Sequence, residues 1–262
     1  MSNYTVNASI LLTDLPILQR PAAVAAAGFG AAEFWWPFAV AVPADSQVDA
    51  FVGAVRDAGI QLSGLNFFAG DMPAGDRGLV SWVGRESEFA DNVDVVVGIG
   101  DRLGCRAFNA LYGLRADGVS AEAADELGAA HLRLAADKVA GIGGTVLLEP
   151  VSGSPAYPLK TADDVQTVID RVGASNLKLL ADFYHLAVNG DDVAAVIANQ
   201  AADFGHIQIA DDPGRGQPGT GELPLAEWLD AASAGGYDGY VGLEYKDSSA
   251  DPFGWLPRAQ RT

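Results

Sequence analysis

Four side chains that carry oxygen ligands stand inside or directly after apolar runs in the second half of the chain. They are Glu149 in TVLLEP, Asp182 in LKLLAD, Gln208 in HIQIAD and Glu244 in GYVGLEYK. An ionised carboxylate at such a position must be paired or bound to a cation. Three carboxylates and a carboxamide suit Mg²⁺ or Mn²⁺ and allow Co²⁺, whereas zinc prefers His and Cys. The sequence therefore predicts a divalent-metal site.

Two further residues are candidates for contacts with a substrate. His185 follows Asp182 by three residues and could donate a hydrogen bond or carry a proton near neutral pH. Arg215 is the only cation in the segment ADDPGRGQPGTGE, and its guanidinium suits a carboxylate or a pair of hydroxyls. The alternative for Arg215 is a structural ion pair with Asp211 or Asp212.

The other two histidines are predicted to be structural. His206 lies two residues before Gln208, so alternation along a strand puts both on one face, with His206 deeper in the core. His131 falls within a helical pattern, and we expect it on the protein surface.

Short apolar runs alternate along the chain with Ala-rich helical patterns, and Gly commonly stands where a helix should end. The predicted strands are 6–11, 32–35, 61–66, 107–111, 145–149, 178–182, 206–210 and 239–244. The predicted helices are 17–27, 45–58, 86–103, 122–142, 162–172, 191–198 and 225–234.

Eight strands that alternate with helices indicate a parallel sheet. A length of 262 residues fits one (β/α)8 TIM barrel, and the G-x-G-x-x-G fingerprint of an open dinucleotide-binding sheet is missing. We therefore predict a single α/β domain over residues 1–262. Catalytic groups of such barrels lie at the carboxyl ends of the strands, where the four oxygen ligands are expected to converge.

The composition bears on which partners and which cellular compartment are expected. A formal net charge of −18 disfavours nucleic acid. No apolar run is long enough to suggest a membrane span, and the first residues do not look like a signal peptide. The single Cys105 fits a reducing compartment, so we expect a cytoplasmic protein. Aromatic residues at 35, 36, 38, 67 and 68 are candidates for a pocket wall, for the core or for an oligomer contact.

Several segments together resemble the hydroxypyruvate isomerase family of the xylose-isomerase-like barrels, over nearly the whole chain. The most specific are LNFFAGDMPAGDRGLVS and HIQIADDPGRGQPGTGEL, and others are AAAGFGAAEFWWPF, GRESEF, LGCRAFNALYG, LLEP and GYDGYVGLEYK. The resemblance implies a TIM barrel with a Glu-Asp-Gln-Glu metal site, and those positions match Glu149, Asp182, Gln208 and Glu244. Homo-oligomers are common among such barrels.

The resemblance also implies roles for individual residues. Glu149 and Glu244 match the glutamates that accept and donate the proton in related ketose epimerases. His185 and Arg215 match positions that contact substrate oxygens. The chain departs from the family after its fifth strand, where EPVSGSPAYPLKT replaces an Asn- and Asp-containing pattern, and at Asn109, where a histidine is expected. Asn109 is accordingly a candidate substrate contact, and both departures bear on substrate identity.

The implied reaction is an aldose–ketose isomerisation of a small hydroxy-oxo acid through an ene-diolate, with hydroxypyruvate giving tartronate semialdehyde. A glutamate would move the proton, a divalent ion would stabilise the charge, and Arg215 would hold the substrate carboxylate. A 2-oxo-tetronate isomerase or a ketose 3-epimerase on the same site is the main alternative. An endonuclease-IV-like repair enzyme and a non-catalytic sugar-acid binding protein are more distant ones.

Overall fold

Eight parallel strands form a closed barrel in the computed structural model, which describes residues 3–261. Each strand pairs with the next along the chain, and β8 pairs with β1 to close the ring. The strands are β1 Asn3–Asn7, β2 Ala31–Phe34, β3 Gln61–Asn66, β4 Ala107–Asn109, β5 Thr145–Leu148, β6 Leu177–Asp182, β7 His206–Ile209 and β8 Tyr240–Leu243. The predicted TIM barrel is confirmed.

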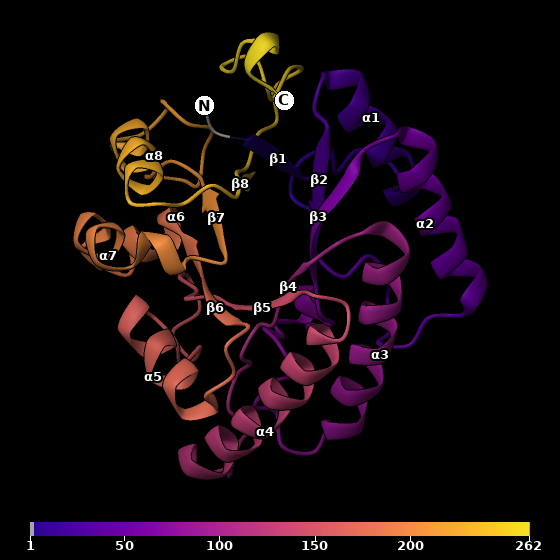
Figure 1. Ribbon diagram of the computed structural model, residues 1–262, viewed down its shortest axis with the longest axis vertical. Coiled ribbons are helices and arrows are strands. Elements are labelled where there is room, and N and C mark those ends of the chain that lie inside the picture. Colours follow the sequence, from indigo (N-terminus) through magenta and orange to yellow (C-terminus); the bar gives the residue numbers. More distant parts are fainter. Residues whose placement is uncertain (1–2, 262) are drawn as a thin grey trace.

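The helices surround the strands as an outer ring (Figure 1). They are α1 Arg20–Ala27, α2 Asp45–Ala58, α3 Glu86–Leu103, α4 Ala121–Ala140, α5 Ala162–Val172, α6 Phe183–Val188, α7 Val193–Gln200 and α8 Leu225–Ala234. Short 3-10 helices are η1 Ile17–Gln19, η2 Met72–Ala74, η3 Ala201–Asp203 and η4 Arg258–Gln260. Within residues 3–261, no helix combines the length and the apolar character needed to cross a membrane.

The helices pack on the barrel through one apolar face each, and α2 is an example. Val48, Phe51, Val52 and Val55 recur at the spacing of one helix face and are all buried. The helix ends at Ala58, and Gly59 caps it in the left-handed conformation (φ 68°) that favours glycine and lets the chain turn back into β3. The same strand–helix unit recurs around the ring and brings the carboxyl end of every strand to one face of the barrel.

The first strand differs from its prediction. The apolar run led us to expect a strand over 6–11, but β1 ends at Asn7. The Asn7 side-chain oxygen accepts a hydrogen bond from the Ser9 backbone N–H, and the Asn7 carbonyl accepts one from Leu11 N–H, so the chain turns away from the sheet. Leu11 is buried through the packing of this turn instead.

His131 is a second correction, because it is not on the surface. It lies on α4 with 7% of its area exposed, and its Nδ1 is 2.9 Å from the carbonyl oxygen of Val80. Its ring stacks on Phe89 of α3 with the ring centroids 4.9 Å apart. The helical pattern alone did not show that α3 and α4 pack along this face.

Candidate active site

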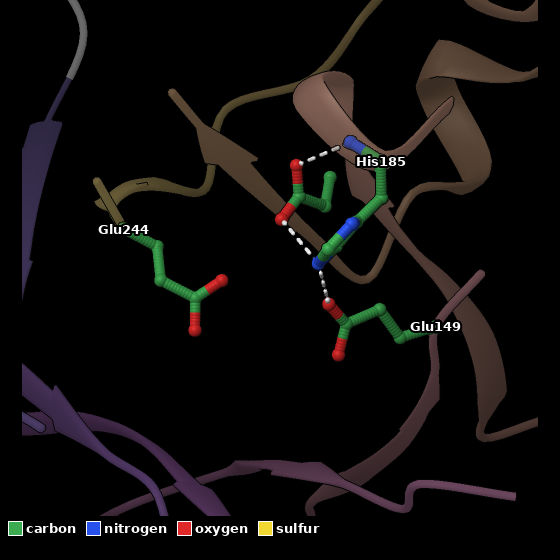
Figure 2. A group of neighbouring side chains, drawn as sticks. Glu149, His185 and Glu244 are labelled. Carbon is green, nitrogen blue, oxygen red and sulfur yellow. Dashed lines mark hydrogen bonds and ion pairs between the residues drawn. The ribbon is translucent and has the colours of Figure 1, made fainter. Parts of the chain in front are cut away.

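The strand register places two of the predicted oxygen ligands side by side. Asp182, the last residue of β6, is opposite Gln208 of β7. Glu149 and Glu244 each follow their strands β5 and β8 by one residue. All four side chains are buried. Figure 2 shows that the carboxylates of Glu149 and Glu244 come from opposite sides of the same opening and point toward each other.

A cluster of potential metal ligands results. Glu149, Asp182, His185 and Glu244 each offer one ligand atom, and these atoms all lie within 4.8 Å of one another. In the part of the chain that the structure describes, this is the one group of three or more His, Cys, Asp or Glu side chains with such geometry. Of the four groups that the sequence predicts to converge, Glu149, Asp182 and Glu244 lie in this cluster, and the cluster can hold a metal ion.

Negative charge is crowded in this cluster. The pKa of Glu149 is raised well above its ordinary value, because burial desolvates the carboxylate and the charges of Glu244 and Asp182 lie close. Burial also raises the pKa of Glu244 to about 8, with Arg215 opposing the shift and Asp182 adding to it. A bound cation would relieve this repulsion and favour the ionised form of both glutamates.

Gln208 has one satisfied and one unsatisfied end. Its Nε2 donates a hydrogen bond of 2.7 Å to Oε1 of Glu33, whereas its Oε1 is buried with no hydrogen-bond partner among the described residues. A buried acceptor without a partner costs free energy, so such an atom is a candidate ligand position. The orientation of the amide, with nitrogen toward Glu33, leaves the oxygen available to a cation.

Glu33 is a site residue that the sequence reasoning missed. It lies in β2 with 3% of its area exposed, and its carboxylate crosses the barrel interior to β7. Oε1 also accepts from Asn7 Nδ2 at 3.1 Å, and Oε2 lies 2.6 Å from Nε2 of His206. The rule that singled out Gln208, a polar residue inside an apolar strand, applies equally to AAEF and would have found Glu33.

The Glu33 carboxylate occupies the space beside Gly242 of β8. A Cβ atom at Gly242 would lie 2.7 Å from Oε1 of Glu33 and 2.8 Å from Cγ of Gln208. Real Cβ atoms do not approach neighbours this closely, so the absence of a side chain at Gly242 lets the buried network form.

Gly242→Ala is expected to lower the free energy of unfolding by about 1–3 kcal/mol, because the added methyl displaces Glu33 and Gln208. Thermal unfolding would check this, and Glu33→Asp, which shortens the acid, should reduce the penalty in a double-mutant cycle. Gly98→Ala in α3, where an added Cβ meets no atom within 4 Å, is the matched control and should not destabilise. Equal melting temperatures for Gly242→Ala and wild type would contradict this packing.

Asp182 has a second structural role, as the cap of a helix that we did not predict. Its Oδ1 accepts a hydrogen bond of 3.0 Å from the backbone N–H of His185. This bond caps the N-terminus of α6, which starts directly after β6. This turn places the His185 ring over the cluster, with Nε2 3.6 Å from Oδ2 of Asp182 and 3.7 Å from Oε1 of Glu149. Aspartate followed by FYHLAV was the available signal for this short helix.

The protonation state of His185 follows from its neighbours. The Ser152 backbone N–H donates to Nδ1 at 3.1 Å, and the Ser152 hydroxyl lies 2.7 Å from the same nitrogen. Burial lowers the pKa of His185 to about 4, so the ring is neutral at pH 7. Since Nδ1 accepts, Nε2 carries the proton and points it at the two carboxylates. This tautomer makes Nε2 a donor rather than a metal ligand.

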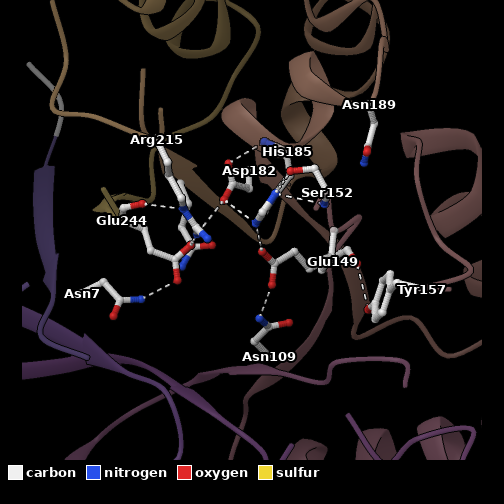
Figure 3. A network of polar contacts seen from close by, with 12 residues as sticks. Asn7, Asn109, Glu149, Ser152, Tyr157, Asp182, His185, Asn189, Arg215 and Glu244 are labelled. Atoms are coloured by element: carbon white, nitrogen blue, oxygen red, sulfur yellow. Dashed lines mark hydrogen bonds and ion pairs between the residues drawn. The ribbon is translucent and has the colours of Figure 1, made fainter. Parts of the chain in front are cut away.

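Arg215 points into the cluster from the loop between β7 and α8. Its Nη2 donates a hydrogen bond to Oε2 of Glu244 and lies 3.7 Å from Oδ2 of Asp182; Figure 3 shows both contacts as dashed lines.

The structural alternative for Arg215, an ion pair with Asp211 or Asp212, is not observed. Asp211 is buried and instead accepts hydrogen bonds from backbone N–H groups of the loop, including Gly219 at 2.8 Å. Arg215 itself has a left-handed backbone (φ 57°), which is uncommon outside glycine and often marks functional sites.

Neighbouring amides and an indole hold the two glutamates. Asn109, at the end of β4, donates from Nδ2 to Oε2 of Glu149 at 2.7 Å, while its Oδ1 is buried without a hydrogen-bond partner among residues 3–261. Glu244 Oε1 accepts from Asn7 Nδ2 at 2.9 Å and from Trp35 Nε1 at 2.7 Å. Figure 3 shows Asn7 and Asn109 reaching the two carboxylates from different sides. Glu149 is thus fixed by one of these hydrogen bonds and Glu244 by two.

A cavity of about 290 Å³ opens onto these groups. Its wall includes Glu149, Glu244, His185 and Arg215, so two carboxylates, a neutral imidazole and a guanidinium face one small volume. Asn109, Asp182 and Gln208 are not part of the wall and lie behind it. The arrangement can bind a small polar molecule and move a proton on it from either side.

Curated relatives match this chain along almost its full length. It is 51% identical to a protein of Streptomyces coelicolor named putative hydroxypyruvate isomerase, with 98% of this chain and 96% of that one covered. It is 33% identical to a 2-oxo-tetronate isomerase of Cupriavidus necator, with 98% of each covered.

A solved structure and a family model give the same fold. The structure of a protein described as AP endonuclease, family 2, from Brucella melitensis superposes with a TM-score of 0.89 at 31% identity, covering 98% of each chain. The model of the xylose isomerase-like TIM barrel matches residues 21–261. The chain therefore belongs to the xylose isomerase-like TIM barrel family.

Proposed function

We propose that this protein is a divalent-metal-dependent isomerase that interconverts hydroxypyruvate and tartronate semialdehyde through an ene-diolate. The observation that carries the proposal is the opposed pair Glu149 and Glu244, whose carboxylates face one small cavity and converge with Asp182 within 4.8 Å. The names of the relatives, hydroxypyruvate isomerase and 2-oxo-tetronate isomerase, support a small hydroxy-oxo acid as substrate.

The residues present fit a hard divalent ion. Glu149, Asp182, Glu244 and the unpartnered Oε1 of Gln208 would hold it, and this all-oxygen set favours Mg²⁺ or Mn²⁺. His185 stands outside the ligand set because its Nε2 carries a proton. When bound, the ion supplies Lewis-acid stabilisation of negative charge that develops on the substrate oxygens.

The two glutamates carry the proton chemistry. In hydroxypyruvate one carboxylate removes a proton from C3, which gives the ene-diolate. The proton of the C3 hydroxyl is then transferred to the C2 oxygen, and a proton returned to C2 completes the product. Because Glu149 and Glu244 face the cavity from opposite sides, either can be the acceptor while the other, or His185, handles the second proton. Asn109, Asn7 and Trp35 hold the carboxylates in place for this transfer.

His185 and Arg215 bind the reacting oxygens. The Nε2–H of His185 is a fixed donor in the cavity, set by the hydrogen bond from Ser152 to Nδ1. Arg215 lies against Glu244, where it can donate to an oxygen of the substrate next to the base. Such donors act on the ene-diolate more strongly than on the ground state, because its oxygens carry more charge.

A 2-oxo-tetronate isomerase is the second candidate, favoured by the relative from Cupriavidus necator and by the altered segment after β5. Ser152 and Gly153 of that segment line the cavity, so the departure from the family pattern lies where a longer substrate would reach. A ketose 3-epimerase would use the same glutamate pair.

DNA repair is not proposed, although one similar structure carries an endonuclease title. Only one of the three histidines, His185, faces the cavity, and a net charge of −18 opposes binding to a phosphate backbone. A purely binding function does not account for two opposed carboxylates with raised pKa values at one small cavity.

A substrate panel followed by proton NMR tests the proposal. The protein with Mn²⁺ should convert hydroxypyruvate to tartronate semialdehyde faster than it converts 2-oxo-tetronates or common ketoses. Turnover of a 2-oxo-tetronate alone would move the substrate to the second candidate. No turnover of any member would contradict the isomerase proposal.

Metal binding should depend on pH in a defined direction. A carboxyl group whose pKa is raised in the folded protein favours folding below its ordinary pKa of 4.5, and this contribution is lost as the pH rises through about 8 for Glu244. Metal-free protein should therefore lose this contribution between these values, and Mn²⁺ should restore it by displacing the proton.

We expect Mn²⁺ at 100 times its Kd to stabilise the protein by about 2.7 kcal/mol at pH 8, which raises Tm by roughly 5–10 °C. The same Mn²⁺ concentration should give a smaller shift at pH 5.5. His185, with a pKa lowered to about 4, stays neutral in the folded protein at both values. Equal Tm shifts at pH 5.5 and pH 8 would be inconsistent with metal binding to these glutamates.

A further inference from the structure

Two cationic side chains in the wall of the active-site cavity have no role in the metal site or in the proton transfer proposed above. Arg77 comes from the loop between β3 and α3, and Lys246 follows Glu244 by two residues after β8. Both line the same cavity of about 290 Å³ as Glu149 and Glu244. The chain has 16 basic against 34 acidic residues, so two cations without an acidic partner at one small cavity call for a ligand.

Arg77 presents an open edge of its guanidinium. Its Nη1 donates to the backbone carbonyls of Met72 at 3.0 Å and Asp76 at 2.7 Å, which fixes the group in its loop. Its Nε and Nη2 have no hydrogen-bond partner among residues 3–261, and no carboxylate of that range lies within 4.0 Å. Nε and Nη2 form the edge that binds a carboxylate with two parallel hydrogen bonds.

Lys246 is positioned by its backbone and has a free side chain. Its N–H donates to the carbonyl of Arg215 at 2.7 Å, which ties the start of this segment to the β7–α8 loop. The ammonium group is exposed and forms no ion pair within the described residues. It can therefore reach an anion in the cavity at little cost in desolvation.

Arg215 is poorly placed for a substrate carboxylate, in contrast to our expectation from the sequence. Its guanidinium is already bonded to Glu244 and lies 3.7 Å from Asp182, so its charge is balanced by two buried carboxylates.

We propose that Arg77 and Lys246 bind the carboxylate of the substrate and thereby select a hydroxy-oxo acid over a neutral ketose of similar size. The inference rests on the proposed isomerase function and specifies its substrate class. With the carboxylate at these two cations, the adjacent oxo and hydroxyl carbons of the same molecule extend toward Glu149, Glu244 and His185, which line the same cavity. The acid group then fixes the orientation of the carbons that exchange the proton.

Arg77→Met, Lys246→Met and the double variant test this assignment with a charged and a neutral substrate. Hydroxypyruvate and dihydroxyacetone differ by replacement of the carboxylate with a hydroxymethyl group. Each single variant should raise KM for hydroxypyruvate about 10-fold and the double variant about 100-fold, with kcat changed less than about threefold. The kcat/KM for dihydroxyacetone should not fall, and Arg77→Lys should retain part of the affinity.

Lys138→Met is the control for the general loss of positive charge. Lys138 lies on the exposed face of α4, 2.8 Å from Asp94, so its removal changes the net charge equally without touching the cavity. It should leave KM for hydroxypyruvate unchanged. An equal rise of KM in Lys138→Met would assign the effect to the general field and overturn the proposal.

Calorimetric titration with glycerate and glycerol separates this proposal from the isomerase function. Wild type should bind glycerate more tightly than glycerol, and the double variant should lose that preference. If wild type turns over hydroxypyruvate but the double variant keeps its KM and its glycerate affinity, the carboxylate assignment is wrong and the isomerase function stands. If no substrate is turned over yet the double variant loses glycerate binding, the assignment stands and the isomerase function falls. Equal binding of both probes to wild type overturns the assignment.

Discussion

Replacing either Glu149 or Glu244 with glutamine is expected to lower kcat for hydroxypyruvate by about 10²- to 10⁴-fold at saturating Mn²⁺, with the barrel still folded. Glutamine keeps the shape and an acceptor oxygen, so the hydrogen bonds from Asn109 to Glu149 and from Trp35 to Glu244 can persist. What is lost is a group that can take up or return a proton. Steady-state kinetics with thermal unfolding of each variant would measure this.

Metal affinity must be measured in the same variants, because both glutamates are also proposed ligands. A fall in kcat that remains at saturating Mn²⁺ reports proton transfer, whereas a fall that added Mn²⁺ reverses reports only ligand loss. Glu126→Gln on the exposed side of α4 is the matched control and should behave as wild type. Near-normal kcat in both Glu149→Gln and Glu244→Gln would remove the basis of the proposed mechanism.

Asp182→Asn is the second change for which we expect a large effect, in this case on metal affinity. Asparagine is as good a helix cap as aspartate. The hydrogen bond from the His185 N–H that caps the N-terminus of α6 should therefore survive. The negative charge at Oδ2 is lost, and with it an oxygen ligand. Mutation of residues that only hydrogen-bond to metal ligands changes metal affinity by about 10- to 100-fold. Because Asp182 is itself a proposed ligand, we expect Mn²⁺ affinity to fall by about 100-fold or more.

The measurement is Mn²⁺ binding by calorimetry or electron paramagnetic resonance, with no substrate present. Asp192→Asn provides the control, because Asp192 caps α7 through a 3.0 Å bond to Ala195 N–H in an exposed position. It should leave Mn²⁺ affinity unchanged. Unchanged affinity in Asp182→Asn, with α6 intact, would show that the ion is not held here.

The sequence predicts the barrel and the convergence of the oxygen ligands because both depend on local patterns. Apolar strands alternate with amphipathic helices, and a carboxylate at the end of a buried strand is costly unless it is paired or bound. That reasoning located Glu149, Asp182 and Glu244, whose ligand atoms lie in one cluster. The ends of parallel strands meet on one face of a barrel, so spacing by one strand–helix unit was sufficient.

Features that depend on packing between distant segments were not predictable in the same way. The contact of Glu33 in β2 with His206 in β7 crosses the barrel and has no local signature beyond one acid in an apolar strand. The burial of His131 depends on how α4 packs on α3. The pairing of Arg215 with Glu244, rather than with a nearby aspartate, depends on the path of the β7–α8 loop.

The altered segment after β5 contacts His185 as well as lining the cavity. Ser152 lies in this segment, and its backbone N–H and hydroxyl both lie at Nδ1 of His185. The segment therefore sets which nitrogen of His185 carries the proton, in addition to shaping the cavity wall. A change that looked like one of substrate identity alone also bears on the donor that faces the reacting oxygens.

The most direct test of the account is the conversion of hydroxypyruvate in D₂O with Mn²⁺, followed by NMR. Proton transfer by Glu149 and Glu244 through an ene-diolate predicts deuterium at C2 of tartronate semialdehyde and, with time, at C3 of the remaining hydroxypyruvate, because carboxylate protons exchange with solvent. Formation of tartronate semialdehyde with hydrogen retained at C2 and no deuterium in either compound would contradict this account. It would indicate that the hydrogen moves directly between the two carbons without passing through a glutamate.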